Sequence, residues 1–239
     1  MAGLNNNTKL LLHFDGADAA TTTTDAAGRH TPINFVGNAQ LDTSNKKWGT
    51  ASLELDGTGD SINIADSADW DLVASTSDNW TIDLQVQHDD HVGNEYYITH
   101  FENDDNQWAI YHSHGTGLRF YFRQGAVTRI WTGAGEITDT NFHHVSLCKV
   151  GSEYGVYKDG VQVSFVDYSA TTDTFTGSLH IGQGSNDFFF DGRFDEPRVQ
   201  KSNIFSASPN VGLTDTITVP TGAYGKAPGG VGVGAPLIF

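Results

Sequence analysis

The sequence predicts an all-β protein built as a two-sheet antiparallel β-sandwich. Apolar and polar residues alternate in many short runs, which is the two-residue period of a strand with one buried face. Gly, Asn, Asp, Ser and Thr separate these runs at regular spacing, and 27 residues are Gly. The 239 residues are long for one average domain but ordinary for one sandwich. We therefore expect one domain with its core between two sheets.

The first third of the chain is expected to carry short strands between polar loops. These strands are expected at residues 8–14, 31–36, 52–56 and 61–64. The last two are interpreted as a hairpin around Gly57-Thr58-Gly59-Asp60. An acidic loop follows, and it is expected to hold one helical turn near Trp70.

The middle of the chain contains the most regular alternation. In residues 80–87, WTIDLQVQ, the side chains of Trp80, Ile82, Leu84 and Val86 share one face of a strand. Further strands are expected at residues 96–101, 107–112, 118–123, 127–132, 178–181 and 188–198. This rhythm is typical of two packed antiparallel sheets.

Residues 141–163, NFHHVSLCKVGSEYGVYKDGVQV, predict three strands in a row. Asp159-Gly160 lies between apolar-rich runs and predicts a type I′ turn, which requires positive φ at both residues. His143 and His144 are neighbours on a strand, so their side chains point to opposite faces and do not easily bind one ion. His112 and His114 are two residues apart, so they share one face of a strand, but the sequence shows no evident third ligand for zinc.

The character of the chain changes after residue 205. Residues 206–239 are rich in Thr, Pro and Gly, and they are expected to form an extended segment with a flexible Gly-rich tail. The chain ends in Leu237, Ile238 and Phe239, which are apolar. We interpret the tail either as disordered or as a peptide that docks on a neighbouring subunit.

Charge and cysteine content exclude several classes of protein. The net charge is −16, from 29 acidic and 13 basic residues, and such a surface repels nucleic-acid phosphates. No run approaches the ~20 apolar residues that a membrane span needs, so membrane insertion is not expected. The single cysteine, Cys148, cannot form an intrachain disulfide, and the N-terminus shows no signal-peptide pattern. We therefore expect synthesis in a cytoplasm without classical secretion.

Several segments together resemble one family. WGTASLELDGTGDSINI, NFHHVSLCKVGSEYGVYKDG and LHIGQGSNDFFFDGRFDEPRVQKSNIF resemble successive segments of laminin-G-like, concanavalin A-like jelly-roll domains. The resemblance implies an N-terminal arm at residues 1–7, a jelly-roll domain at 8–205 and a C-terminal segment at 206–239. Phe142 stands where this family usually has Trp, and Pro197 predicts an edge or a bulge in the last strand.

The version of this domain that reads LLLHFDG near its start is similar to domains of bacteriophage virion proteins. This resemblance implies a non-enzymatic structural protein of the capsid or tail, such as a decoration or fibre subunit, made in the host cytoplasm. Its expected partners are other virion subunits and further copies of itself, and its expected ligands are host-surface glycans. The alternative is a secreted carbohydrate-binding module, and a third reading is a glycosidase of the same fold.

The acidic residues do not support the glycosidase reading. A glycosidase needs two carboxylates about 5–5.5 Å or about 6.5–9.5 Å apart, and related laminarinase-type glucanases carry them on one strand. The nearest run here is Glu54, Asp56 and Asp60, whose third acid follows a glycine turn. No Gly-x-Ser-x-Gly elbow or phosphate-loop pattern occurs. We therefore expect no enzymatic activity.

The resemblance also implies a structural calcium site. In concanavalin A-like sandwiches such a site joins the end of the first strand, an early glycine carbonyl and an acid on the last strand. The matching positions are Asp15, Gly57 or Asp60, and Asp195. Calcium prefers carboxylate and carbonyl oxygens, which these residues supply.

Sugar binding requires aromatic platforms with polar partners in a concave site. The middle strands supply aromatic, histidine and arginine side chains, although alternate ones must fill the core. The glycan-binding candidates are Tyr97, His100, Trp108, Tyr111, Arg119 and Trp131.

Overall fold

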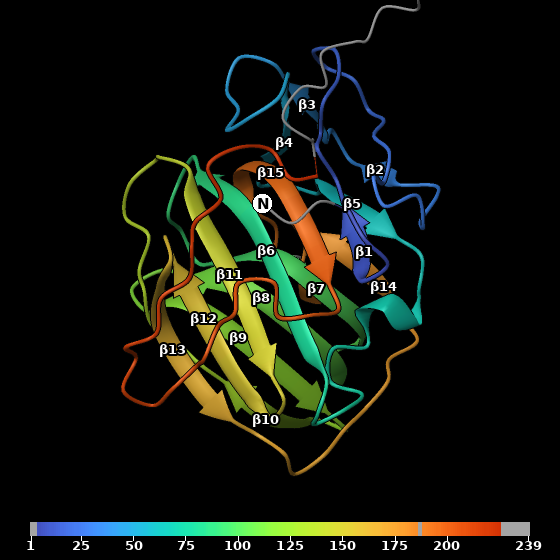
Figure 1. Ribbon diagram of the computed structural model, residues 1–239. Helices are drawn as coiled ribbons and strands as arrows, with labels where there is room; N and C mark the ends of the chain where they lie inside the picture. The colour runs from blue at the N-terminus through green and yellow to red at the C-terminus, as the bar shows by residue number, and fades with distance from the viewer. Residues whose placement is uncertain (1–3, 186–187, 226–239) are drawn as a thin grey trace, which may run out of the picture.

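The computed structural model describes residues 4–185 and 188–225, which form two antiparallel sheets packed face to face (Figure 1). One sheet has eight strands. In spatial order they are β13 (Val161–Asp167), β12 (Glu153–Lys158), β11 (His143–Val150), β6 (Asn79–His88), β15 (Asp191–Gln200), β4 (Ser52–Asp56) and β3 (Gln40–Asp42), with β1 (Thr8–Leu11) paired to β15. The predicted all-β sandwich is confirmed.

The second sheet has seven strands and lies behind the first in Figure 1. In spatial order they are β10 (Val127–Trp131), β9 (Gly117–Gln124), β8 (Asn106–Ser113), β7 (Asn94–Asn103), β14 (Ser178–Ile181), β5 (Ser61–Ile64) and β2 (Asn34–Val36). A 3₁₀ helix, η1 (Ala68–Trp70), forms at the predicted helical turn. Among the described residues, no helix is long and apolar enough to cross a membrane.

The core lies between the two sheets, and β6 supplies its central row. Trp80, Ile82, Leu84 and Val86 are all at most 1% exposed and belong to one apolar cluster, as their alternation predicts. Phe120 and other apolar side chains of the seven-stranded sheet meet them from the opposite side. Full burial of each such side chain contributes about 1.5–3 kcal/mol, so this row stabilises the sandwich strongly.

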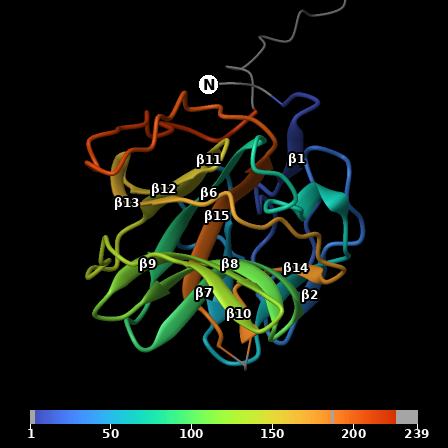
Figure 2. The ribbon, with the colours of Figure 1, turned by 90° about the horizontal axis from the view of Figure 1, so that it is seen from below.

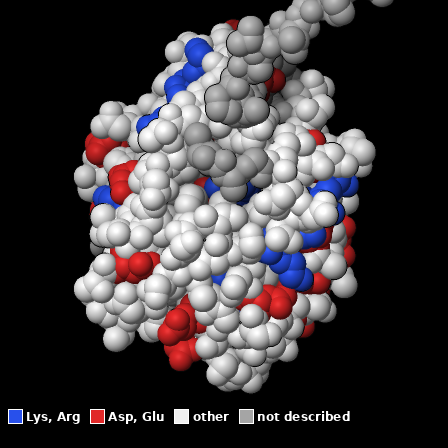
Figure 3. Space-filling view, in the orientation of Figure 1, with Lys and Arg blue, Asp and Glu red and all other residues white. Residues whose placement is uncertain are grey.

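The segment that follows β15 covers the outer face of the eight-stranded sheet (Figure 2). Ile217 donates its backbone N–H to the carbonyl of Gly160 at 2.8 Å, and Val161 and Thr216 form an isolated bridge. A second apolar cluster joins Cys148, Tyr157, Ala207 and Ile217 beneath this segment. Charged side chains lie mainly around the periphery of this face (Figure 3). The predicted apolar end, residues 237–239, lies outside the described residues.

Of two turns predicted from the local sequence, the structure confirms one and contradicts the other. Asp159 and Gly160 have φ of 49° and 85°, so the predicted type I′ turn between β12 and β13 is confirmed. The hairpin predicted around residues 57–60 is wrong. β4 pairs within the eight-stranded sheet and β5 within the seven-stranded sheet, so the chain crosses between layers there. Short-range spacing cannot distinguish a crossing from a hairpin.

Pro197 lies in β15 at an irregular position, as predicted. The register of β15 with β6 shifts between Asp195 and Arg198, and Glu196 has a positive φ of 54°. Proline has no N–H for the ladder, so a bulge accommodates it.

Candidate functional site

The outer face of the seven-stranded sheet carries a group of aromatic and arginine side chains. They come from neighbouring strands in register: Tyr96 pairs with Tyr111, which pairs with Arg119, and Tyr121 pairs with Trp131. Alternate residues of these strands fill the core, so their neighbours point outward. We call this group of five residues the aromatic face.

The aromatic face presents one exposed indole beside a planar cation, next to a tyrosine pair that is 6% exposed at each residue. The rings of Tyr96 and Tyr111 stack with centroids 4.6 Å apart and planes within 8°. Trp131 is 64% exposed, and the Arg119 guanidinium carbon lies 4.8 Å from its ring centroid. Arg119 also donates to the carbonyl of Thr132 at 3.0 Å, which fixes its orientation. Planar rings next to a guanidinium can stack against a ligand and donate hydrogen bonds to it.

Tyr96 and Tyr111 of this face are largely buried, each with 6% of its surface exposed. Desolvation raises the pKa of both Tyr96 and Tyr111 above the ordinary tyrosine value. Both hydroxyls are neutral at physiological pH, as an ordinary tyrosine hydroxyl is.

Three of the six predicted glycan-binding residues lie on this face, and three do not. Tyr111, Arg119 and Trp131 belong to it. Tyr97, His100 and Trp108 are 0% exposed, so the prediction that they contact a glycan is wrong. Each of these three side chains makes a hydrogen bond inside the protein: Tyr97 with His88, His100 with the carbonyl of Gly177, and Trp108 with the carbonyl of Trp70.

A register shift explains why Tyr96, and not the predicted Tyr97, lies on the aromatic face. β7 pairs with β8 through a bulge between Tyr96 and Ile98, so Tyr97 turns into the core beside Ile98 and Tyr96 faces outward. Phe188 also joins the aromatic face, with its ring centroid 5.9 Å from that of Tyr96. The sequence did not predict that Phe188 lies beside Tyr96, because Phe188 belongs to a loop far from Tyr96 along the chain.

The residues predicted for calcium lie in separate hydrogen-bond environments. Asp60 accepts backbone N–H groups from Asn38 and Asp56, which fixes the chain where it crosses between sheets. Asp15 accepts hydrogen bonds from the backbone and hydroxyl of Thr50. Within residues 4–185 and 188–225, no group of three His, Cys, Asp or Glu ligands includes these acids.

Asp195, the remaining acid predicted to bind calcium, is 0% exposed. One of its oxygens accepts the backbone N–H groups of Lys47 and Trp48 at 2.9 and 2.8 Å. Its other oxygen, Oδ1, has no hydrogen-bond partner among the described residues. Burial raises the pKa of Asp195 to about 8, with the charges of Glu196 and Asp15 contributing. Calcium binding here stays a prediction.

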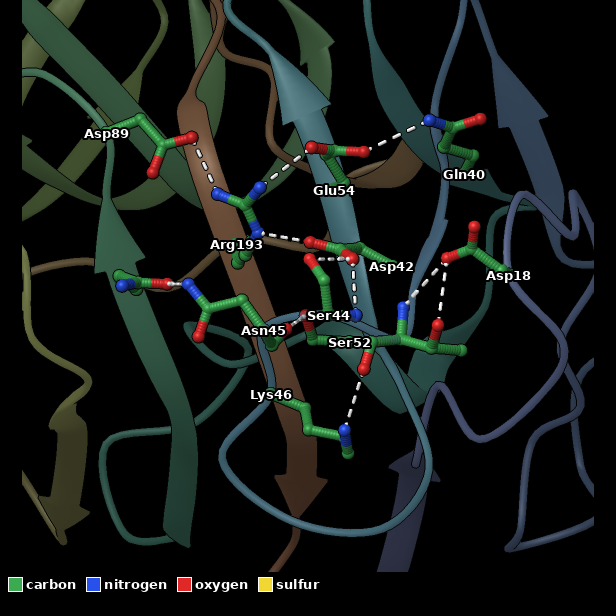
Figure 4. Close-up of polar contacts among 12 residues, drawn as sticks. Asp18, Gln40, Asp42, Ser44, Asn45, Lys46, Ser52, Glu54, Asp89 and Arg193 are labelled. Atoms are coloured by element: carbon green, nitrogen blue, oxygen red, sulfur yellow. Dashed lines mark hydrogen bonds and ion pairs between the residues drawn. The ribbon is translucent and has the colours of Figure 1, made fainter.

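Arg193 binds three carboxylates, one of which is Glu54 of the Glu54, Asp56 and Asp60 run (Figure 4). Its guanidinium contacts Asp42 at 2.7 Å, Glu54 at 2.8 Å and Asp89 at 2.6 Å, and Gln40 donates to Glu54. Glu54 is therefore committed to a link between β4 and β15. The absence of enzymatic activity stays a prediction.

Comparisons with known proteins agree with this architecture. A family model named Laminin_G_3, described as the concanavalin A-like lectin/glucanases superfamily, matches residues 56–207. A search of curated proteins finds no match to the chain.

Solved structures with the same fold have low sequence identity to the chain. Domain 4 of AbnA, a GH43 extracellular arabinanase from Geobacillus stearothermophilus in complex with arabinotriose, has a TM-score of 0.65 at 16% identity and covers 82% of this chain and 93% of that one. The binding domain of botulinum neurotoxin DC in complex with SialylT has a TM-score of 0.61 at 13% identity. The same domain in complex with rat synaptotagmin II has a TM-score of 0.63 at 12% identity. These two matches cover 83% and 84% of this chain but only 49% and 50% of the botulinum chains. At such identities the likeness shows the fold alone.

Proposed function

The chain belongs to the Laminin_G_3 family of the concanavalin A-like lectin/glucanases superfamily, and from this premise we propose that it is a non-enzymatic carbohydrate-binding protein. One observation carries the proposal: the exposed indole of Trp131, with Arg119 beside it, adjoins the stacked pair Tyr96 and Tyr111 on a sheet face. Fold membership alone does not decide function, so the proposal rests on this surface.

The chemistry of the aromatic face suits a sugar ring. The C–H faces of a pyranose or furanose are apolar and flat enough to stack on an indole, while hydroxyls at the ring edge need planar polar partners. Arg119, beside the exposed indole of Trp131, supplies such a partner. The structures with arabinotriose and with SialylT are consistent with this use of the fold, although each ligand belongs to that protein.

Replacing Trp131 with alanine is expected to weaken glycan binding by about 2 kcal/mol, roughly thirtyfold in Kd, because truncating an aromatic contact commonly costs this much. A glycan array identifies the ligand, and titration calorimetry with the best hit gives both affinities. Val127→Ala is the matched control, since Val127 is also exposed on β10 and is 47% accessible. An array without hits, or equal affinity of Trp131→Ala and wild type, would contradict the proposal.

We place this carbohydrate-binding protein in a bacteriophage particle, as a capsid or tail subunit that assembles with virion proteins and with copies of itself. The support is the sequence resemblance of its LLLHFDG start and its GNAQLDTSNKKWGTASLELDG segment to virion domains. The expected result is that the chain co-purifies with intact particles at a fixed ratio to the major capsid protein, measured by quantitative mass spectrometry. Its absence from particles, with a monomer in the culture medium, would favour a secreted carbohydrate-binding module.

A further inference from the structure

Three buried side chains with nitrogen or oxygen donors meet at one rim of the sandwich. His88 ends β6, Glu95 lies near the start of β7, and His112 lies near the end of β8. Each offers one ligand atom, and these atoms lie within 4.8 Å of one another. The side chains of His88 and His112 are 0% exposed and that of Glu95 is 2% exposed. Among the described residues, no other group of this kind forms.

Two polar atoms of this group have no hydrogen-bond partner among the described residues. Glu95 Oε1 and His112 Nδ1 are buried and make no hydrogen bond with any described residue. The other Glu95 oxygen lies 2.7 Å from His88 Nδ1 and 3.7 Å from His112 Nδ1. Native proteins rarely leave buried polar atoms unpaired, so two such atoms in one cluster indicate a missing partner.

A third histidine approaches the same cluster. His91 lies in the connection between β6 and β7, and its ring centroid is 5.2 Å from that of His88 and 6.4 Å from that of His112. Its Nε2 atom is also buried and has no hydrogen-bond partner in the part of the chain that the structure describes. His91 lies outside the group of three whose donor atoms are within 4.8 Å of one another, so a shared centre with His91 requires this connection to move.

We propose that His88, Glu95 and His112 bind a divalent transition metal of the zinc class, with His91 as the fourth ligand. Two or three imidazoles and one carboxylate form a donor set that suits tetrahedral zinc, whereas calcium requires six to eight oxygens. The site is independent of the aromatic face, so glycan binding and metal binding can fail separately.

Neighbouring groups can orient both buried imidazoles for metal binding. His88 Nε2 lies 2.7 Å from the Tyr97 hydroxyl oxygen, which can accept a hydrogen bond from Nε2–H when Nδ1 binds the ion. His112 Nε2 accepts the backbone N–H of Ile137 at 3.1 Å and lies 3.7 Å from Glu136 Oε1. Binding of an ion at Nδ1 of His112 requires the imidazole proton to move to Nε2, which then donates toward Glu136 and no longer accepts from Ile137. A carboxylate or hydroxyl partner of this kind is usual behind a metal-bound histidine.

The electrostatic surroundings favour a cation. Asp89, which pairs with Arg193, and Asp90 precede His91. Burial raises the pKa of nearby Asp191, and the charges of Asp90, Asp89 and Glu95 raise it further. A bound dication would offset the excess negative charge at this rim.

Titration of the untagged full chain with Co²⁺ tests the proposal. The expected result is one equivalent of bound Co²⁺ with the visible absorption of a tetrahedral complex, which Zn²⁺ then displaces. Glu95→Gln and His112→Gln should each lower the affinity by at least roughly a hundredfold, and Tyr97→Phe by roughly 10–100-fold. His180→Gln is the matched control, because His180 is a half-buried histidine of the same sheet outside the cluster. No stoichiometric binding, or equal affinity of Glu95→Gln and wild type, overturns the proposal.

A second measurement uses the wild-type chain alone, so it does not depend on the folding of a variant. Zinc addition should shift the imidazole ¹⁵N resonances of His88 and His112 in the pattern of Nδ1 coordination. Shifts confined to exposed histidines, such as His114 with its 58% exposed side chain, would overturn the proposal.

Discussion

Replacing Arg198 with leucine is expected to lower the free energy of unfolding by about 3–5 kcal/mol, because it leaves a charged carboxylate buried without its partner. Arg198 donates to both oxygens of Asp83 at 2.8 and 2.9 Å, and Asp83 is 0% exposed. His144 lies 3.2 Å from the same carboxylate, and the Tyr224 hydroxyl donates to it at 2.6 Å. One arginine therefore neutralises a polar cluster between the sheet and the C-terminal segment.

The pKa of Asp83 gives this prediction a pH signature. Burial alone would raise the pKa, but Arg198 and His144 outweigh it and lower the pKa to about 2. The folded pKa is below the unfolded value near 4, so the pair stabilises the fold above about pH 4 and loses this effect as pH falls toward 2. Without Arg198, burial keeps the Asp83 pKa high. The deficit of Arg198→Leu relative to wild type should therefore shrink in acid.

Urea unfolding of both proteins at pH 7 and at pH 3 measures the deficit. Arg123→Leu is the matched control, since Arg123 pairs with Asp105 at 3.2 Å with side chains 32% and 56% exposed. Exposed pairs contribute about 0–1 kcal/mol, so this variant should lose little. A loss in Arg198→Leu no larger than in the control, or one that is independent of pH, would refute the role of the buried pair.

Asp83 also shows what the sequence could not predict. The alternation of residues 80–87 correctly assigned Trp80, Ile82, Leu84 and Val86 to the core. The same rule suggests that Asp83 should face water, yet it is fully buried because residues 201–225 return over the outer face. Two-residue periodicity describes a strand and one neighbour layer, and it contains no information about a later segment that covers the other side.

The regularity of each strand decides how well the sequence predicts which candidate residues share a face. Tyr111 and Arg119 lie on the outer face because β8 and β9 pair without a register shift, whereas Trp131 lies beyond a shift between β10 and β9. Glycan binding by these three residues stays a prediction. Tyr96 was missed because a bulge reverses the faces at that point. His112 was recognised as a possible ligand, but its partners His88 and Glu95 come from other strands that meet only through the strand order. Local patterns predict which face of a strand a residue lies on. A site also depends on which strand ends lie next to one another at the edge of the sandwich.

Replacing Asp195 with asparagine is expected to raise the free energy of unfolding by up to about 5 kcal/mol at pH 8 in the presence of chelator. Burial raises the pKa of Asp195 from 3.8 to about 8, a difference of about four units at ~1.4 kcal/mol each. The folded state therefore holds a proton between pH 4 and 8 that the unfolded state has released, so the stability of wild type falls as pH rises through this range. Asparagine has no such cost, and its amide can still accept from Lys47 and Trp48.

The same variant tests whether Asp195 is a carboxylate destabilised by burial or a ligand of calcium. A calcium ion at Asp195 Oδ1 would favour the charged form, so calcium should raise the melting temperature of wild type at pH 8 and chelator should lower it. Asp195→Asn should be stable in chelator and respond less to calcium, while Asp167→Asn, at an exposed aspartate, should behave as wild type in both buffers. If Asp195→Asn is stabilised but calcium changes nothing in wild type, the carboxylate is strained and the calcium prediction is wrong. If neither change occurs, a neighbouring group must already compensate the charge of Asp195, and the burial argument itself fails.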